Sequence, residues 1–232
     1  MLTPFFACFI LNLVVVSQQQ SNNLILGFGD SYTSGGGGSG SYPIVAGKLL
    51  NWQAKNFAVG GSKMNNIPAQ LAKAGAVLNN ATHIVFTTGG NDLGVASSLQ
   101  AIIINNNYPA VADKTISLKP QLVSTYKLIK ASVRPSTKIY ALPYVDFISR
   151  GNKIPNEYDA HRLMDLLSDT VKAAAEEAGI GFIEAVKTAF AGHEMYSTDP
   201  YSAGLSGSGA AHPNAKGYSR IGEVVADYIK KN

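Results

Sequence analysis

Three side chains that could together perform acyl transfer stand in separate segments of the chain. Ser31 follows the apolar run Leu24–Phe28, Asn91 follows the run His83–Thr88, and His212 precedes the last helix-like segment. A serine hydroxyl becomes an effective nucleophile when a neighbouring base removes its proton. Histidine is the side chain suited to that task near neutral pH. The three residues therefore indicate nucleophilic catalysis, provided that the fold brings them together.

The same segments offer hydrogen-bond donors for a developing negative charge. In acyl transfer the carbonyl oxygen becomes an oxyanion, and loss of one preorganised donor costs about 2.7–4 kcal/mol. Asn91 supplies a side-chain N–H, and the backbone N–H of Ser31 lies at the predicted start of a helix. A glycine at Gly60 or Gly61 lets another N–H come close because it has no Cβ. These donors predict an oxyanion hole.

Four segments, GDSYTSG, NFAVGG, GGND and HPNAKGY, resemble in this order the four sequence blocks of the SGNH/GDSL hydrolase family. The resemblance implies that Ser31 is the nucleophile and His212 the base. It implies oxyanion donors at Ser31, at Asn91 and at Gly61, which lies five residues after Asn56. It also implies an esterase, lipase, thioesterase or carbohydrate deacetylase with a three-layer α/β/α fold, working without a cofactor or metal.

One position departs from the pattern of the family. Many members carry an aspartate three residues before the histidine, where this chain has Gly209. A backbone carbonyl near Gly209 could hold the imidazole N–H instead, or Asp199 could fold back through the Ser/Gly stretch to do so. A neutral acceptor stabilises the imidazolium less than a carboxylate does. A third alternative is therefore a weakened enzyme, in the extreme a secreted binding protein of the same fold.

Each of these residues also has a structural interpretation. Ser31 or Asn91 could cap a helix, and His212 could belong to an ordinary loop before the last helix. We expect Asp30 to cap or brace its loop, since its side chain must point away from its neighbour Ser31. The glycine tract Gly35–Gly40 matches G-x-G-x-x-G but lacks the strand-to-helix context of a nucleotide site. We interpret it as a flexible loop at the rim of the site.

The remaining histidines show no spacing typical of a zinc site. We expect His83 to be structural, His161 to lie on the solvated face of a long helix, and His193 to lie in a loop that could line the cleft. The 232 residues carry a net charge of +4 without a lysine- or arginine-rich cluster, which argues against nucleic-acid binding. The expected partner is a small ester or lipid, with transient contact to a lipid surface, and the protein is expected to be a monomer.

The N-terminal residues differ in composition from the rest of the chain. Their apolar stretch over residues 4–16 is shorter than the roughly 20 residues that span a bilayer. We interpret residues 1–20 as a secretory signal peptide and residues 21–232 as a single secreted domain. The single cysteine, Cys8, lies in the signal segment, so the mature chain has no thiolate nucleophile and no disulfide. Asn80 begins an N-glycosylation triplet.

Apolar runs bounded by turn residues alternate with segments of helical spacing, which is typical of a mostly parallel sheet. The predicted strands are Leu24–Phe28, Gln53–Val59, His83–Thr88, Lys138–Val145 and Gly181–Val186. The predicted helices are Tyr42–Leu50, Ile67–Leu78, Gln121–Val133, Asn156–Ala178 and Ala215–Lys230. This order predicts an α/β fold, a three-layer α/β/α sandwich with a flavodoxin-like, doubly wound sheet of five strands. Ligands of such folds bind beyond the carboxyl ends of the strands, where the candidate residues stand.

Substrate selection is expected to depend on two segments treated as loops, residues 95–118 and 146–156. They carry apolar side chains that could form an acyl pocket or could pack in the core, namely Ile102, Ile103, Ile104, Phe147 and Ile148. Tyr32 and Tyr42 could line the approach to Ser31 or belong to the core.

Overall fold

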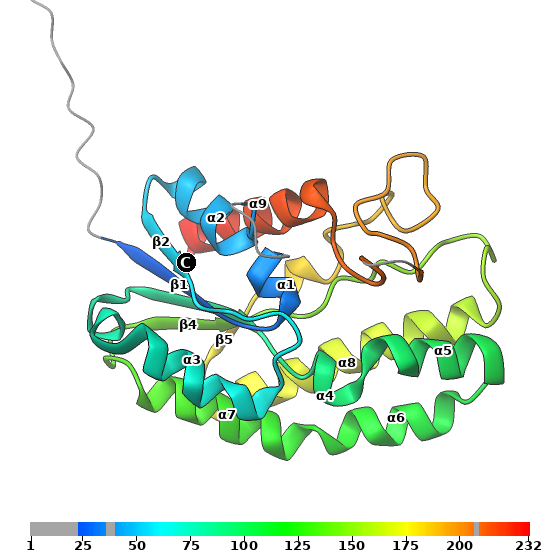
Figure 1. Cartoon of the computed structure of the whole chain (residues 1–232), viewed down its shortest axis with the longest axis horizontal. Coiled ribbons are helices and arrows are strands. Elements are labelled where there is room, and N and C mark those ends of the chain that lie inside the picture. The colour runs from blue at the N-terminus through cyan, green and yellow to red at the C-terminus, as the bar shows by residue number, and fades with distance from the viewer. Residues whose placement is uncertain (1–22, 36–39, 207–208) are drawn as a thin grey trace, which may run out of the picture.

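The computed structural model describes residues 23–35, 40–206 and 209–232. In this part of the chain, five parallel strands form one sheet in the order β2-β1-β3-β4-β5 (Figure 1). The strands are β1 (Leu24–Gly29), β2 (Gln53–Asn56), β3 (His83–Thr87), β4 (Lys138–Ala141) and β5 (Gly181–Phe182). The predicted α/β class and doubly wound parallel sheet are confirmed.

The central strands are apolar because both faces of the sheet are covered. Every residue of β1 and β3 is buried, whereas the edge strand β2 alternates between exposed and half-buried residues. Continuous burial of this kind is expected for parallel strands that lie between two layers of helices. The hydrophobic core therefore lies on both sides of β1 and β3. Because these strands are parallel neighbours, their carboxyl ends lie together at the same edge of the sheet.

Helices cover the two faces of the sheet as separate layers (Figure 1). One layer contains α2 (Tyr42–Leu50) and α9 (Ala215–Lys231), which pack closely. Their contact requires Gly222, since a Cβ there would lie 2.5 Å from Val45 Cγ1. The other layer contains α3 (Ile67–Ala74), α7 (Lys119–Ala131) and α8 (Glu157–Ala178).

The segment treated as a loop over residues 95–118 is helical, which corrects the prediction. It forms α5 (Val95–Asn105) and α6 (Tyr108–Ser117), which extend the layer of α8 (Figure 1). Leu99 and Ile102 are buried, and Ile104 is exposed, so the run of isoleucines turns around the helix instead of forming one apolar strand-like stretch. Residues 146–156 are irregular, as predicted, and Phe147 and Ile148 are fully buried there.

Several predicted elements end earlier in the structure. β2, β4 and β5 stop three to four residues before their predicted ends, and the polypeptide continues as extended chain or turns. The predicted helix over 67–78 changes at Gly75 into 3₁₀ turns over Gly75–Asn80. Two further short 3₁₀ segments are η2 (Met64–Asn66) and η4 (Glu184–Val186). Asn80 is exposed, as a glycosylation acceptor must be.

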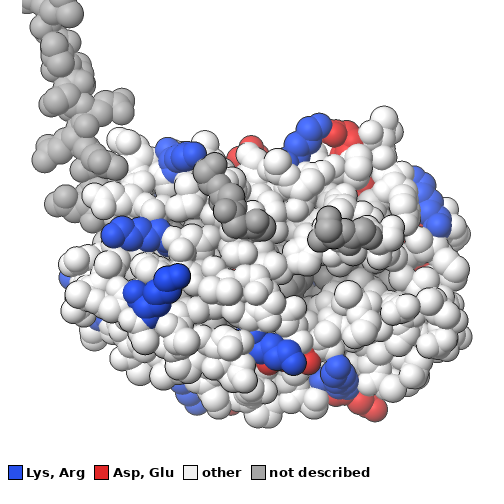
Figure 2. Space-filling model, viewed as in Figure 1, with Lys and Arg blue, Asp and Glu red and all other residues white. Residues whose placement is uncertain are grey.

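The predicted signal peptide at residues 1–20, Cys8 and the middle of the glycine tract lie outside the described residues. No helix among the described residues combines the length and the apolar character needed to span a bilayer. On the face shown in Figure 2, the lysine and arginine side chains stand singly or beside acidic ones.

Candidate active site

Ser31 is presented by a sharp turn at the end of β1. Gly29 has φ +112°, and a Cβ at this position would lie 1.9 Å from the carbonyl oxygen of Thr87, so only glycine allows the turn. Asp30 then caps α1 (Ser31–Ser34) by accepting a hydrogen bond of 3.0 Å from the N–H of Tyr32. Ser31 is thus the first residue of the helix and not its cap, and its side chain is partly exposed.

His212 meets Ser31 although 181 positions separate them in sequence. The imidazole Nε2 lies 2.6 Å from Ser31 Oγ, and Nδ1 lies 2.7 Å from the carbonyl oxygen of Ala210. Because a carbonyl oxygen only accepts hydrogen bonds, Nδ1 carries the proton. Nε2 is then the free base that accepts the serine hydroxyl proton. The arrangement is a serine–histidine pair in which the histidine tautomer is set by a backbone carbonyl.

The acceptor of the His212 Nδ1 proton is a backbone carbonyl and not the carboxylate of Asp199. The carbonyl of Gly209 accepts the backbone N–H of His212 at 3.0 Å and not the imidazole. Asp199 is exposed and pairs with Lys216 Nζ at 2.5 Å, so the expectation that it orients His212 is corrected. The alternative prediction, a backbone carbonyl near Gly209, agrees with this geometry, and the carbonyl is that of the next residue, Ala210.

Asn91 reaches the Ser31 side of the site from α4 (Gly90–Leu93), whose cap is Gly89. Its Nδ2 donates one hydrogen bond of 2.9 Å to the carbonyl of Ser62. A carboxamide nitrogen carries two hydrogens, so the second remains available in the cleft that Asn91 and Ser31 both line. Asn91 is therefore not a helix cap. One N–H of its side chain links α4 to the loop at Ser62, and the other can donate to a substrate.

The two glycines after β2 have different positions. The turn over residues 59–62 is closed by a hydrogen bond of 3.2 Å from Ser62 N–H to the Val59 carbonyl, and Gly61 adopts φ +77° in it. Gly60 faces the nucleophile, since a Cβ on it would lie 3.9 Å from Ser31 Cβ. Within the described residues, the N–H groups of Gly60, Gly61 and Ser31 donate to no protein acceptor. These free donors can face a substrate oxygen.

Replacing Asn91 with alanine is expected to lower kcat by about 10²-fold with little change in KM, because its donor acts on charge that develops after binding. The free energy of unfolding should fall by about 1 kcal/mol, since the Ser62 carbonyl loses its partner. Kinetics on a soluble ester and urea unfolding measure the two effects. Exposed Asn65 provides the matched control. A kcat for Asn91→Ala equal to that of Asn65→Ala would contradict the assigned donor.

A buried polar network that the sequence did not reveal supports both Ser31 and Asn91. The carboxylate of Asp30, fully buried, accepts hydrogen bonds from Thr87 Oγ1 at 2.9 Å and from the Tyr144 hydroxyl. Tyr144 in turn accepts the N–H of Gly90 at 2.8 Å. Burial raises the pKa of Asp30 to about 6, although these donors act in the opposite direction. No sequence signal singled out Tyr144, because the predicted strand Lys138–Val145 contained it, whereas β4 (Lys138–Ala141) ends before it.

Gln70 on α3 was also missed. Its side chain pairs with both the N–H and the carbonyl of Gly29, at 2.7 and 2.8 Å, and its Nε2 lies 3.1 Å from Ser62 Oγ. One buried carboxamide thus joins the turn before Ser31 to the loop that carries the glycine donors. Tyr42, in contrast, is fully buried against Thr33 and does not line the approach to Ser31.

The cleft at Ser31 continues into an apolar hollow. The first part, about 290 Å³, is lined by Ser31, Asn91 and His212 and by apolar groups that include Met164. The second part, about 390 Å³, extends along α5 to Leu99, Ile103, Ile104 and Leu205. Both are lined by Ala96, Ser97, Ala210 and Ala211, so they share a wall. Helix α5, in a segment that was predicted to be a loop, therefore forms one side of an apolar groove that leads away from Ser31.

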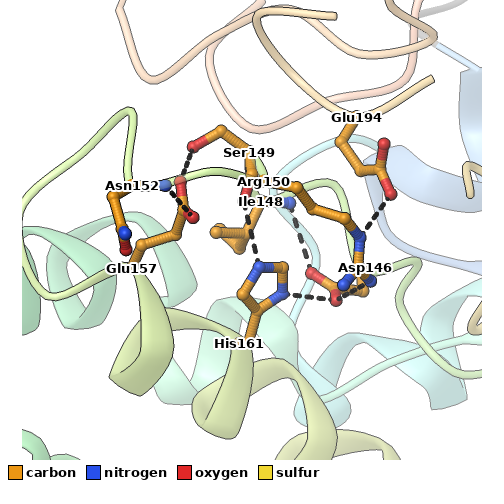
Figure 3. Close-up of polar contacts among 8 residues, drawn as sticks. All are labelled: Asp146, Ile148, Ser149, Arg150, Asn152, Glu157, His161 and Glu194. Atoms are coloured by element: carbon orange, nitrogen blue, oxygen red, sulfur yellow. Dashed lines mark hydrogen bonds and ion pairs between the residues drawn. The ribbon is translucent and has the colours of Figure 1, made fainter. Parts of the chain in front are cut away.

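His161 is not on a solvated helix face, which corrects that prediction. Figure 3 shows it enclosed by the segment after β4, where Nδ1 lies 2.6 Å from Asp146 Oδ2 and Nε2 lies 3.0 Å from the Ser149 carbonyl. The carboxylate and the carbonyl can only accept hydrogen bonds, so each ring nitrogen must carry a proton. An imidazole with both nitrogens protonated is positively charged. The hydrogen bond that His161 donates to the Asp146 carboxylate is the main cause that raises the pKa of His161. The cluster ties α8 to the irregular segment beside the active site.

The raised pKa of His161 predicts how stability changes with pH. Its contribution is complete below the unfolded-state pKa of about 6.5 and is lost as the pH rises through the higher folded-state value. Urea unfolding between pH 5.5 and 9 should therefore show a loss of about 1–2 kcal/mol that His161→Gln lacks. Asp146→Asn, which removes the charged acceptor and keeps its shape, should also lack it. An unchanged pH dependence in both variants would contradict the assigned charge.

The two other histidines lie away from the cleft. His83 packs against Trp52 at 4.7 Å between ring centroids, and burial lowers its pKa to about 4, which fits a structural role. His193 stacks on Tyr201 at 3.8 Å and contacts the carbonyl of Asp199. Over residues 23–35, 40–206 and 209–232, no group of three or more His, Cys, Asp or Glu side chains could hold a metal ion.

The model of the GDSL-like lipase/acylhydrolase family matches residues 28–220, and the chain belongs to this family. The resemblance seen in the four sequence blocks is thereby confirmed, and with it membership of a hydrolase family that acts on acyl esters. A search of curated proteins gives no match.

Solved structures agree in fold. A phospholipase A1 from Streptomyces albidoflavus NA297 has a TM-score of 0.73 at 23% identity, with 90% of this chain and 99% of that chain covered. An extracellular lipase from Streptomyces rimosus has a TM-score of 0.72 at 22% identity, covering 89% and 99%. An acetyl xylan esterase from Geobacillus stearothermophilus has a TM-score of 0.56 at 16% identity, covering 91% and 94%. At these identities the likeness concerns the fold.

Proposed function

We propose that the protein is a secreted serine hydrolase that cleaves carboxylic esters through an acyl-enzyme on Ser31, with His212 as the base. The observation that carries the proposal is the contact of 2.6 Å between His212 Nε2 and Ser31 Oγ, with the opposite ring nitrogen held at 2.7 Å by a carbonyl. A secreted binding protein has no need of this geometry. The secreted location rests on the apolar N-terminal segment of the sequence alone.

The first half-reaction forms the acyl-enzyme. Ser31 Oγ attacks the carbonyl carbon of the ester while His212 Nε2 takes the hydroxyl proton. The carbonyl π electrons move to oxygen, and the oxyanion is met by the N–H of Ser31, an N–H of the turn at Gly60 and Gly61, and Asn91 Nδ2. The bond to the leaving alcohol then breaks as His212 gives its proton to that oxygen. The products are the free alcohol and an ester of Ser31.

The second half-reaction repeats the steps with water. His212 Nε2 removes a proton from water, whose oxygen attacks the acyl-Ser31 carbonyl, and the same donors stabilise the second oxyanion. Collapse releases the carboxylic acid and returns the proton to Ser31 Oγ. The neutral Ala210 carbonyl fixes the tautomer throughout, but it offers the transient imidazolium less stabilisation than a carboxylate would. We therefore expect a modest kcat.

The groove favours an ester with an apolar acyl group. It starts at the candidate oxyanion donors and continues past Ala96 to Leu99 and Ile103 on α5, with few polar side chains along its walls. An acyl chain that leaves the reacting carbonyl can follow this surface and bury its methylenes, each worth about 0.8 kcal/mol when fully buried. An acetyl group would use only the part of the cleft next to Ser31.

A panel of nitrophenyl esters from acetate to laurate, with acetylated xylan and a phospholipid alongside, tests the proposal. We expect kcat/KM to rise from acetate to medium chain length and then level off as the groove fills. Activity on acetylated xylan above that on every nitrophenyl ester would favour a carbohydrate O-acetyl esterase instead. No turnover of any ester by folded protein would favour the binding protein.

Ala96→Phe should block the passage between the two parts of the groove. Ala96 is exposed and lines both parts, so the larger ring fills the groove without disturbing the core. We expect kcat/KM for an octanoate ester to fall about tenfold while that for acetate stays within twofold. Ala72→Phe, at another exposed helical alanine, is the control. Equal losses on both esters would mean that the acyl chain lies elsewhere.

A further inference from the structure

We propose that Tyr32 is a positioning residue for His212, because it holds the turn whose Ala210 carbonyl takes the place of the absent aspartate. The inference rests on the proposed function and concerns how its base is kept in place. The observation behind it is a hydrogen bond of 2.8 Å from the Tyr32 hydroxyl to the carbonyl of Ala211, between residues 179 positions apart in sequence.

The turn before His212 needs an external support. Ala211 has φ +60°, a left-handed conformation that a non-glycine residue adopts only at a cost in free energy. This conformation decides the relative direction of the Ala210 carbonyl and the His212 side chain, which meet at 2.7 Å. The Ala211 N–H is held by the Gly204 carbonyl at 3.0 Å. The Tyr32 hydroxyl donates to the carbonyl of the same residue. Both backbone polar groups of Ala211, the N–H and the carbonyl, are therefore hydrogen-bonded.

Tyr32 is itself rigidly placed beside the nucleophile. Its backbone N–H is bound by the cap Asp30, and its ring packs edge-on against Tyr144 with centroids 4.9 Å apart. The ring also lies 5.8 Å from the imidazole of His212, and only 7% of the residue is exposed. Burial raises the pKa of its hydroxyl well above the usual value, so the group stays a donor. One residue thus couples the helix that presents Ser31 to the turn that aims His212.

Loss of the hydroxyl has a specific consequence for the base. Without its outer support the turn can relax toward an ordinary conformation, and the Ala210 carbonyl moves away from Nδ1 of His212. The imidazolium then loses part of its stabilisation, and the ring is less often aimed at Ser31. A purely structural tyrosine would affect folding stability but not the protonation of His212.

The test compares Tyr32→Phe with Tyr42→Phe. Tyr42 is buried on the same side of the molecule and also has one hydroxyl contact, at 2.9 Å to Thr33, but it is outside the active site. For Tyr32→Phe we expect kcat to fall about tenfold with KM within twofold, and the acid limb of the kcat/KM profile to move to lower pH. For Tyr42→Phe we expect the wild-type kcat and acid limb, whatever happens to stability.

A second readout does not depend on turnover. The proton on His212 Nδ1 should resonate far downfield in wild type because of its hydrogen bond, and it should move upfield in Tyr32→Phe but not in Tyr42→Phe. If wild type is inactive and the proton still moves, the proposed function fails and the positioning role stands. If wild type is active and Tyr32→Phe keeps both the acid limb and the resonance, the positioning role is overturned and the hydrolase is not.

Discussion

Ser31→Ala is expected to lower kcat on nitrophenyl esters by about 10⁵-fold, with the free energy of unfolding unchanged within about 0.5 kcal/mol. The hydroxyl is partly exposed, and His212 Nε2 is its single protein partner among the described residues. The backbone contacts of Ser31, including the bond of 3.0 Å from the Tyr218 hydroxyl to its carbonyl, do not involve Oγ. Removing Oγ should therefore abolish the nucleophile without loosening the turn that presents it.

Ser34→Ala is the matched control for this substitution. Ser34 lies in the same short helix and is equally partly exposed, but its hydroxyl makes only a long contact of 3.5 Å to the Ser31 carbonyl. Its activity should stay within threefold of wild type. Residual activity of more than a few per cent in Ser31→Ala, with contaminating hydrolases excluded by a mock purification, would show that another residue is the nucleophile.

His212→Gln is expected to lower kcat by about 10⁴-fold or more, the second largest effect. Glutamine retains polarity and volume but provides no base near neutral pH. Because the histidine acts only through the serine, the double variant Ser31→Ala/His212→Gln should be no less active than Ser31→Ala alone. Residues that act as one unit show this lack of additivity.

The same single and double variants distinguish a pair from two independent residues. Initial rates for all four proteins, each checked for folding by circular dichroism, complete the cycle. Losses that multiply would mean that Ser31 and His212 contribute separately. The contact of 2.6 Å between them would then not be the catalytic one.

The features that the sequence predicted best are those expressed in local residue types. The fully apolar run that forms β1 identifies a central strand, and the Gly-Asp-Ser that follows it places Ser31 at the rim. Asp30 was expected to cap or brace the turn, and it caps α1. Asn91 and His212 were found because each is a chemically specific side chain just after a strand or just before a helix.

The features that sequence reasoning missed involve backbone atoms or long-range pairs. The sequence allowed a backbone carbonyl near Gly209 to orient His212, but it could not single out that of Ala210, because every residue type supplies a carbonyl. Asp199 had the right chemistry for that role, but it is exposed and its charge is satisfied by Lys216. The bonds of Tyr32 to Ala211 and of Tyr144 to Asp30 join positions 179 and 114 apart, and the tertiary fold alone determines them.

The prediction of a loop over residues 95–118 was wrong for a different reason. Three consecutive β-branched isoleucines and a run of asparagines have weak helix propensity, and tertiary packing overrides it. Leu99 and Ile102, three positions apart, bury one face of α5 in the core, while Ile104 stays exposed. This packing leaves Ala96 and Ile103 along the groove. The tertiary contacts that make the segment helical therefore also give the cleft its apolar wall.

The most direct test of the account is active-site titration with a fluorophosphonate, followed by peptide mass mapping. The account predicts one label per folded chain on Ser31, little or no label in Ser31→Ala, and much slower labelling in His212→Gln. Folded protein that takes up no label, or that takes it up at another residue, would contradict it.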